Sequence, residues 1–434
     1  MTKTKKRPNF LESISAVVFL LALIVYGIYA GVNTVVMLII ATGWVIVIAY
    51  KCGYRWPELM EAMLERLHGL MEVLLIIFSI GFFIAAMVFS GSIPALIYYL
   101  VNVIDPNFMV VLSFVITGLV AMAIGTSWGT AGTVGLVMVS IATSMGANLP
   151  MVAGAVISGA HVGQILSPMS DTSNVAANFA GTNVQSMIKR MAYYAVPVVV
   201  IAIVAYTILG FFGGAGSASV ANVESIRGEI AKVFNVNPLV ILPMVFVFIL
   251  TFRKKPIIST LIISGFIAIL FGVIFNGFEF SKGLECLYSG FKLNAITGLD
   301  ESAFSEIFLT LVNRGGITSM ISSVLLAIIA TIYGALMTKI EAVNVICETL
   351  FKNVKSRVGL VASTVLVAGL VVGLTTSAYL AVLIASDLFK EKFHAAGMDD
   401  TDLIASCLPA SSQFVVVFPW VDTAIYMAGL TGVA

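Results

Sequence analysis

The chain has 434 residues, of which 60% are hydrophobic and 10% are charged. Soluble domains carry about 25% charged residues and about 45–50% apolar ones, so this composition excludes an ordinary soluble globular protein. The net charge of +1 indicates no nucleic-acid partner.

Long apolar runs follow one another from the N-terminus, beginning with Ile14–Val32, Val35–Tyr50, Met71–Phe89 and Met109–Ile124. Each run is about long enough to cross a hydrocarbon core of about 30 Å as a helix. Continuous runs are not the alternating pattern of a β-barrel. The sequence therefore predicts an all-α polytopic membrane protein in a lipid bilayer. Ile14–Val32 is expected to be a retained first helix, because no small-residue cleavage site follows a short apolar core.

Lysine and arginine predict the orientation, since they are in excess in cytoplasmic loops. The N-terminal tail is basic, the connection from Gly31 to Thr34 is uncharged, and the next connection is basic again through Lys51, Arg55 and Arg66. This alternation predicts a multi-pass protein of the cell inner membrane with its N-terminus in the cytoplasm.

A polar, Gly/Ser-rich stretch divides the chain into an N-terminal transmembrane repeat (1–212), a linker (213–237) and a C-terminal repeat (238–434). Each half begins with a pair of apolar runs, and the second pair is Leu239–Phe252 and Pro256–Phe275. The tip of the first pair is neutral, whereas the tip of the second is Arg253–Lys255. The halves are therefore expected to enter the membrane in opposite senses, as an inverted-topology repeat with the substrate site between the repeats.

The same short motif, P-x-x-D-T, lies late in both halves. It reads Pro168 to Thr172 in the first half and Pro419 to Thr423 in the second. A motif this short can arise by chance, but its similar position in the two halves favours duplication of an ancestral half.

The first candidate binding segment is the run from Gly125 to Gly135, which contains four glycines and four hydroxyl residues. Glycine and hydroxyl side chains weaken a regular helix. Irregular backbone at membrane depth is tolerated where it lines a cavity or is buried in protein. The run is expected to interrupt a helix and to offer oxygen ligands to a hard cation or small polar solute. The alternative is close helix packing through small residues.

The second candidate segment, Ser158 to Asn174, is the densest polar cluster of the chain. Pro168 is expected to break the helix, which places Asp171 just past the break. A carboxylate at membrane depth is a functional hypothesis by default, and this one would bind Na⁺ when ionised and a proton when neutral. The alternative is an N-cap at the membrane edge. His161 is a candidate pH sensor, or a hydrogen-bonded structural residue.

The second half offers corresponding residues. Thr375, Thr376 and Ser377 occupy the place of the first Gly/Thr/Ser run. Ser412 and Gln413 precede Pro419, and Asp422 and Thr423 follow it.

These motifs resemble the NhaC-type Na⁺/H⁺ antiporter family of the ion-transporter superfamily. The resemblance covers most of the chain and is strongest from Gly125 to Asn174. It implies about ten spanning helices, two re-entrant hairpins and broken helices. By motif match it places eight residues at the ion site, namely Thr126, Ser127, Trp128, Thr130, Ser167, Asp171, Thr172 and Asn174.

The second half departs from that family. This chain has Thr375–Tyr379 where family members carry an Asn-x-x-Ala-Asp-type element. It has Ala410–Gln413 where they carry an acidic residue and Gly-Thr, and Asp422-Thr423 where they carry Asn-Thr. Two functions therefore stay open. The first is a Na⁺/H⁺ antiporter with alternating access, in which cation and protons compete for Asp171 and Asp422. The second is a Na⁺- or H⁺-coupled carrier or exchanger of a small carboxylate or amino acid.

Other classes are less favoured by the sequence. An intramembrane hydrolase would need a G-x-S-x-G or G-x-G-D pattern, and a channel does not explain an inverted repeat with broken helices. The four cysteines have no CxxC spacing, so no cofactor is expected beyond transported or coupling Na⁺ and H⁺. The absence of a P-loop pattern indicates transport driven by ion gradients, and a homodimer is left open.

Overall fold

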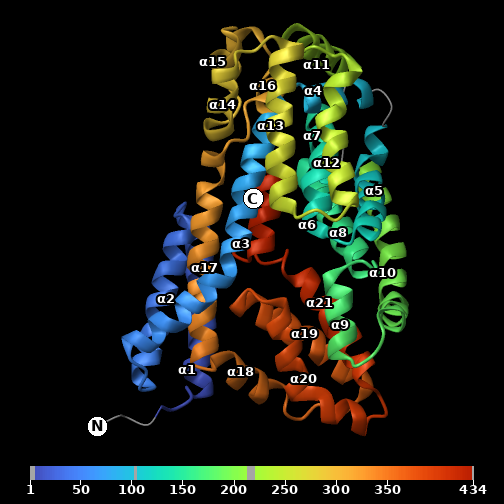
Figure 1. The fold of residues 1–434 in the computed structure, drawn as a ribbon. Helices are drawn as coiled ribbons and strands as arrows, with labels where there is room; N and C mark the ends of the chain where they lie inside the picture. The colour runs from blue at the N-terminus through green and yellow to red at the C-terminus, as the bar shows by residue number, and fades with distance from the viewer. Residues whose placement is uncertain (1–4, 102–104, 213–219, 433–434) are drawn as a thin grey trace. The chain divides into compact units, whose positions relative to one another are not determined.

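The computed structural model describes residues 5–101, 105–212 and 220–432, and within these ranges every regular element is helical (Figure 1). Eight described helices are long and apolar enough to cross a membrane. A ninth span would be the pair Glu224–Val233 and Pro238–Phe252, which is bent by 89°. The predicted all-α, multi-pass membrane architecture is confirmed.

The chain forms two compact units, and each takes residues from both halves of the sequence. Unit 1 contains Met1–Leu74, Asn174–Tyr194 and Ser322–Tyr426. Unit 2 contains Leu75–Ser173, Ala195–Ile321 and Met427–Ala434. The predicted repeats, residues 1–212 and 238–434, do not coincide with these compact units. The repeat stays a prediction.

The helices of unit 1 are α1 (Phe10–Ala30), α2 (Thr34–Lys51), the start of α3 (Trp56–Phe89), most of α17 (Ile321–Lys339), α18 (Ala342–Phe351), α19 (Arg357–Thr375), α20 (Ala378–Ala395) and α21 (Asp400–Phe414). In this unit α1 packs along α2, and α19, α20 and α21 pack on one another.

Unit 2 contains the rest of α3, α4 (Ser92–Leu100), α5 (Met109–Ile124), α6 (Ser127–Thr130), α7 (Leu136–Ser144), α8 (Leu149–Ile165), α11 (Val220–Val233), α12 (Leu242–Phe252), α13 (Ile257–Asn276), α14 (Phe280–Ser289), α15 (Leu293–Thr297) and α16 (Glu306–Val312). The chain passes between the units within α3 and α17 and within α9 (Asp171–Phe179), α10 (Val184–Phe212) and α22 (Asp422–Thr431). Short 3₁₀ turns lie at Pro106–Phe108, Pro238–Ile241, Glu301–Ala303 and Ile317–Met320.

The predicted first hairpin is confirmed as α1 and α2. Residues at each end of α1 explain where that helix begins and ends. The Asn9 side chain accepts from the Glu12 N–H at 2.8 Å, while the Glu12 carboxylate accepts from the Asn9 N–H at 2.9 Å. This reciprocal cap satisfies two donors that a helix start otherwise leaves unpaired. Gly31 ends α1 with φ of 67°, a left-handed conformation that glycine adopts without steric cost.

Helix α3 corrects the expectation that Arg66 lies in a charged connection. The helix runs without interruption from Trp56 to Phe89 and passes the test for a membrane span. Arg66 therefore belongs to the helix that continues into the apolar run, not to a loop between helices. The expectation failed because charge density around Arg66 suggested a surface stretch, while no helix breaker follows Pro57.

Helix α10 has the surface expected of a lipid-facing element. Only 6% of the residues in its most apolar stretch are buried, and Val198, Ile201 and Phe212 are exposed. A soluble protein would not leave so much apolar surface in water. The exposed apolar surface is explained by contact with lipid tails.

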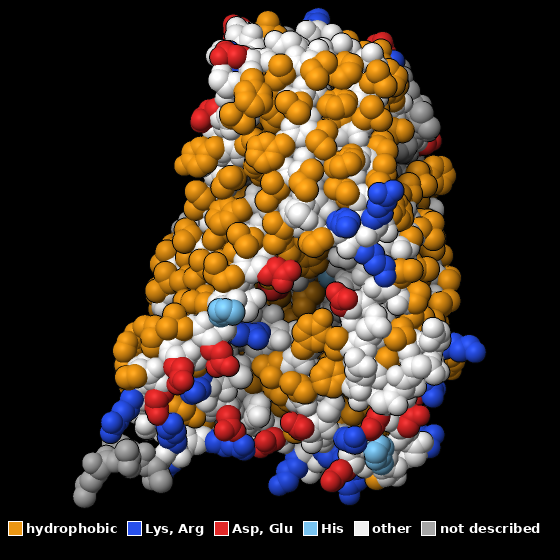
Figure 2. All heavy atoms as spheres, in the orientation of Figure 1, with side chains coloured by type: hydrophobic (Ala, Val, Ile, Leu, Met, Phe, Trp, Pro, Cys, Tyr) orange, Lys and Arg blue, Asp and Glu red, His pale blue; other side chains and the backbone are white. Residues whose placement is uncertain are grey.

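Charged side chains gather at the end of unit 1 that carries α18 and the start of α1 (Figure 2). Arg7 there pairs with Glu341 and lies 3.6 Å from Glu348, and Lys5 lies 2.7 Å from Glu58. These exposed ion pairs each contribute about 0–1 kcal/mol. Their number still marks a water-facing end, because charges are excluded from hydrocarbon.

Helix α11 lies in the stretch that the sequence predicts to be a linker. Residues 213–219 of the linker lie outside the described residues. The Glu229 carboxylate of α11 accepts from the Ser305 N–H at 2.9 Å and from the Ser305 hydroxyl at 2.7 Å. These two bonds fix α11 on the start of α16 within unit 2.

Candidate functional site: two pairs of helix breaks

The first break of unit 2 separates α5 from α6. Gly125 ends α5 with φ of 87°, and Thr126 is extended, with its hydroxyl accepting from the Gly129 N–H at 3.3 Å. The predicted interruption is confirmed at these two residues. Beyond them the Gly/Thr run is helical, with a π turn at Ala131–Gly135. Hydroxyls such as Thr130, which donates to the Thr126 carbonyl at 2.8 Å, bond the preceding turn and permit the helix.

The second break of unit 2 separates α8 from α9 at the predicted proline. Ser167 precedes Pro168, and its hydroxyl accepts from the Met169 N–H at 3.2 Å. Helix α9 then begins at Asp171. The Ser173 hydroxyl donates to the Ile165 carbonyl at 2.9 Å, which satisfies an acceptor at the open end of α8.

The two breaks of unit 2 lie against each other. A Cβ atom on Gly125 would meet the Met169 carbonyl carbon at 2.8 Å, closer than real Cβ contacts allow. Gln164 joins the two breaks, because its side-chain oxygen accepts from the Ser127 N–H at 3.1 Å and its side-chain nitrogen donates to the Thr172 hydroxyl at 2.9 Å. Residues predicted from two separate motifs are thus brought together.

The remaining predicted residues of this region differ in exposure. Asp171 is exposed at the start of α9, and Asn174 is exposed one turn later. Ser127 is 1% exposed, and its hydroxyl oxygen is among the buried side-chain atoms of the described residues that have no hydrogen-bond partner. A buried polar atom without a partner is costly and indicates a place for a ligand or water. Trp128 is half-buried, and His161 is buried in α8.

The Gln164 bridge gives a testable prediction. Replacing Gln164 by Leu removes both bonds and leaves the Ser127 N–H without this acceptor, so we expect the variant to be destabilised by about 1–3 kcal/mol. Thermal unfolding in detergent measures this loss as a lower midpoint. Gln164→Glu keeps the acceptor for Ser127 and should lose less. An unchanged midpoint in Gln164→Leu would contradict the bridge.

Unit 1 contains a second pair of breaks. Helix α19 ends at Thr375, Thr376 is left-handed with φ of 58°, and the Ser377 hydroxyl accepts from the Leu380 N–H at 3.3 Å to begin α20. The other break separates α21 from α22. The Trp420 indole N–H donates to the Gly373 carbonyl at 2.7 Å, so these two breaks also lie together.

Asp422 begins α22, as Asp171 begins α9. Its carboxylate accepts from the Thr423 N–H at 2.6 Å and from the Thr423 hydroxyl at 3.2 Å. Thr423 and Thr375 are buried, and Asp422 is half-buried. Ser412 and Gln413 lie in the last turn of α21, just before the break.

The spacing of these features is the same in both halves of the chain. As many residues separate Thr376 from Asp422 as separate Gly125 from Asp171. Both left-handed residues end a long helix, and both aspartates begin a short one. The Pro-x-x-Asp-Thr motif thus has the same structural role in each half.

Arg66 is a site residue that the sequence analysis did not predict. Its Nη2 donates to the Thr375 carbonyl at 3.2 Å. It lines a pocket of about 380 Å³ together with Ala62, Glu65, Gly69, Ala335, Thr338, Lys339 and Leu380. The apolar run that follows Gly69 without a break is the signal that would have placed Arg66 in a long helix.

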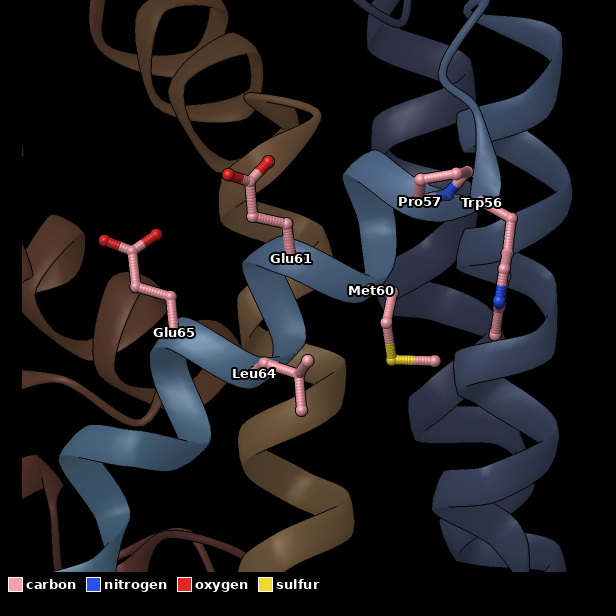
Figure 3. A pocket seen from close by; sticks show the side chains of 6 residues that line it. All are labelled: Trp56, Pro57, Met60, Glu61, Leu64 and Glu65. Atoms are coloured by element: carbon pink, nitrogen blue, oxygen red, sulfur yellow. The ribbon is translucent and has the colours of Figure 1, made fainter.

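A groove beside this pocket lies along the start of α3 (Figure 3). Glu61 and Glu65 extend to the same side of the helix, one turn apart, while Trp56 and Met60 point elsewhere. Among the described residues, no group of three His, Cys, Asp or Glu side chains is arranged to hold a metal ion. Hard cations prefer oxygen ligands, so the hydroxyl, carbonyl and carboxylate oxygens at the helix breaks are candidate ligands.

Comparison with known proteins identifies the family. The model of the Na⁺/H⁺ antiporter family matches residues 9–173 and 159–434. The chain belongs to the Na⁺/H⁺ antiporter family. The resemblance of the Gly125–Asn174 motifs to NhaC-type members is thereby confirmed.

Three known proteins are similar to this chain over nearly its whole length. An uncharacterized Na⁺/H⁺ antiporter of Haemophilus influenzae is 29% identical, over 100% of this chain and 92% of its own. The malate-2H⁺/Na⁺-lactate antiporter of Bacillus subtilis is 28% identical, over 100% and 91%. The Na⁺/H⁺ antiporter NhaC of Bacillus subtilis is 27% identical, over 99% and 94%.

Proposed function

We propose that this member of the Na⁺/H⁺ antiporter family exchanges Na⁺ for protons by alternating access, with Asp171 as the carboxylate for which cation and proton compete. The observation that carries the proposal is the meeting of the two helix breaks in unit 2. Gln164 holds them together, and they present the Asp171 carboxylate and the buried Ser127 hydroxyl. Oxygen atoms of this kind are the ligands of hard cations, and broken helices present them in transporters.

The chemistry requires the two ions to exclude each other. An ionised carboxylate attracts Na⁺, whereas the same group holding a proton has lost the charge that attracts the cation. A site that binds either ion but not both couples the inward gradient of one to the outward movement of the other. The Thr126, Thr130, Ser167 and Thr172 oxygens would complete the shell around the cation.

The membrane setting follows from the same proposal. The chain lies in the bacterial inner membrane with its N-terminus in the cytoplasm, its two halves (1–212 and 238–434) form an inverted repeat around the linker 213–237, and it acts as a transporter and not as an enzyme. The matched spacing of the breaks in the two halves supports the repeat, and the basic N-terminal end of unit 1 supports the orientation. A homodimer is the proposed assembly.

Reconstituted liposomes test the exchange. The protein is placed in liposomes that contain a pH-sensitive dye, and Na⁺, Li⁺ or K⁺ is added outside. We expect Na⁺ or Li⁺ to enter in exchange for protons, so that the internal pH rises, while protein-free liposomes show no change. No pH response to any cation would contradict the proposed function.

Arg66 favours a second candidate function, the coupled exchange of a small organic carboxylate or amino acid. Its guanidinium lines a pocket of a size that fits a small solute. A Bacillus subtilis relative that is 28% identical is named as a malate-2H⁺/Na⁺-lactate antiporter, which supports this candidate. Uptake of labelled malate, lactate and amino acids, with and without Na⁺, separates this function from the first.

A further inference from the structure

The connection between α13 and α17 contains a pocket that the proposed exchange does not use. The pocket has a volume of about 300 Å³ and is lined by residues 289–292 and 313–315 and by Glu301. All of these residues belong to unit 2 and lie between the apolar helices Ile257–Asn276 and Ile317–Lys339. A pocket of this size accommodates a small solute. Its place in a connection between candidate spans makes it a site for a solute that arrives from water.

Backbone contacts hold the two walls of the pocket together. The Phe291 N–H donates to the Arg314 carbonyl at 3.1 Å. A Cβ atom on Gly290 would stand 2.5 Å from the Gly315 carbonyl oxygen, closer than real Cβ contacts allow. Gly290 also has φ of 88°, which glycine adopts without steric cost. The shape of the pocket is therefore set by the backbone, which leaves the charged side chains of its lining for a ligand.

Three charged side chains line the pocket, and two of them are cationic. Arg314 and Lys292 are positive and Glu301 is negative, which leaves one excess positive charge. The Glu301 carboxylate accepts from the Asn313 side-chain amide at 3.0 Å, and the Asn313 oxygen accepts from the Leu293 N–H at 2.8 Å. None of the three charged groups takes part in an ion pair of the described residues. The excess charge therefore suits an anionic ligand.

The chemistry of Arg314 indicates which kind of anion fits. The residue is half-buried, and its Nη2 donates to the Leu430 carbonyl near the end of α22 at 3.2 Å. A guanidinium has five N–H donors, so this bond leaves donors for a second acceptor. Its planar fork matches the two oxygens of a carboxylate, whereas a spherical anion such as chloride offers no such pair.

We propose that this pocket binds a small organic carboxylate, whose oxygens are held by Arg314 and Lys292. A single carboxylate balances the one excess positive charge that remains beside Glu301. None of the lining residues belongs to a helix break. The site therefore goes beyond the proposed Na⁺/H⁺ exchange and does not depend on it.

Thermal unfolding of the full chain in detergent tests the site without transport. Midpoints are compared in sodium propionate and in sodium chloride at equal concentration, so that any effect of Na⁺ is the same in both. We expect propionate to raise the wild-type midpoint above that in chloride by about 2–4 °C, with a concentration dependence that saturates. Equal midpoints in the two salts would overturn the inference.

Two variants assign the effect to this pocket. Lys292→Gln and Arg314→Gln each remove one positive charge, and the second keeps a donor for the Leu430 carbonyl. Loss of a charge-assisted bond should raise the propionate concentration that gives half of the rise by about tenfold. If Arg314 only caps α22, Arg314→Gln lowers the midpoint in chloride but keeps the propionate response. That result, or an undiminished response in Lys292→Gln, would overturn the inference.

Lys282→Gln is the matched control. Lys282 lies on α14, donates to the Ile296 carbonyl at 3.2 Å and does not line the pocket, so its variant should keep the full propionate response. Lys292 is exposed, so Lys292→Gln should fold even where Arg314→Gln does not. A response lost in Arg66→Gln but kept in Lys292→Gln would place the carboxylate in the pocket of unit 1 and overturn the inference. A wild type without exchange in liposomes would refute the proposed function and leave this result unchanged.

Discussion

Asp171→Asn should reduce Na⁺-driven proton movement in liposomes to the level of protein-free vesicles. The amide keeps the size of the side chain but can neither attract Na⁺ as an anion nor take up a proton at physiological pH. Because Asp171 is exposed and begins a short helix, the variant should fold, and its unfolding midpoint should stay close to that of the wild type. Asn is also a good helix cap, so loss of a cap cannot explain a loss of transport.

Asp105 offers a matched control for this prediction. It also precedes a helical turn in unit 2, and its carboxylate accepts from the Asn107 N–H at 2.9 Å, but it lies away from both helix breaks. Asp105→Asn should exchange ions at the wild-type rate. If Asp171→Asn retained exchange at a rate similar to that of Asp105→Asn, Asp171 would not be the competing carboxylate.

Gly163→Ala should have the largest effect on stability. A Cβ atom at Gly163 of α8 would lie 2.1 Å from the Gly118 carbonyl oxygen of α5, and one at Gly159 would lie 2.3 Å from the Phe114 carbonyl oxygen. The two helices are in backbone contact along this small-residue face. Forcing a methyl group into it should cost about 1–3 kcal/mol or more, and should lower the unfolding midpoint and the transport rate together. The rate falls because α5 and α8 carry the two breaks of unit 2.

Gly154→Ala on the same helix is the control. A Cβ atom there meets nothing within 4 Å, and alanine is a better helix former than glycine by about 0.8–1 kcal/mol. Gly154→Ala should therefore unfold at the same temperature as the wild type or higher. An equal loss in both variants would mean that helix propensity and not the α5–α8 contact decides the result.

The sequence predicts the breaks well because their causes are local. Pro168 cannot continue α8, and Gly125 is suited to the left-handed residue that ends α5. The first hairpin and the helices after the linker are predicted by the length of their apolar runs alone. The π turn at Ala131–Gly135 was missed because threonine hydroxyls bond the preceding carbonyls, an effect that composition does not reveal.

The partners of the breaks could not be predicted, because they come from distant parts of the chain. Gln164 belongs to the Ser158–Asn174 segment, but nothing in the sequence of that segment says that it bonds Ser127. Arg66 is far from Thr375 along the chain, and its charged neighbours on α3 suggested the membrane surface. Side-chain bridges of this kind depend on tertiary packing, which neither periodicity nor hydropathy encodes.

The left-handed Thr376 gives the two helix breaks different energies. Gly125 holds its conformation at no steric cost, whereas a branched side chain in that region costs about 1–2 kcal/mol. A conformation in which Thr376 returned to the right-handed region would recover that energy, and about 1.4 kcal/mol is a tenfold change in population. The break of unit 1 is therefore closer than that of unit 2 to an alternative backbone state, and a Thr376→Gly exchange would remove the difference.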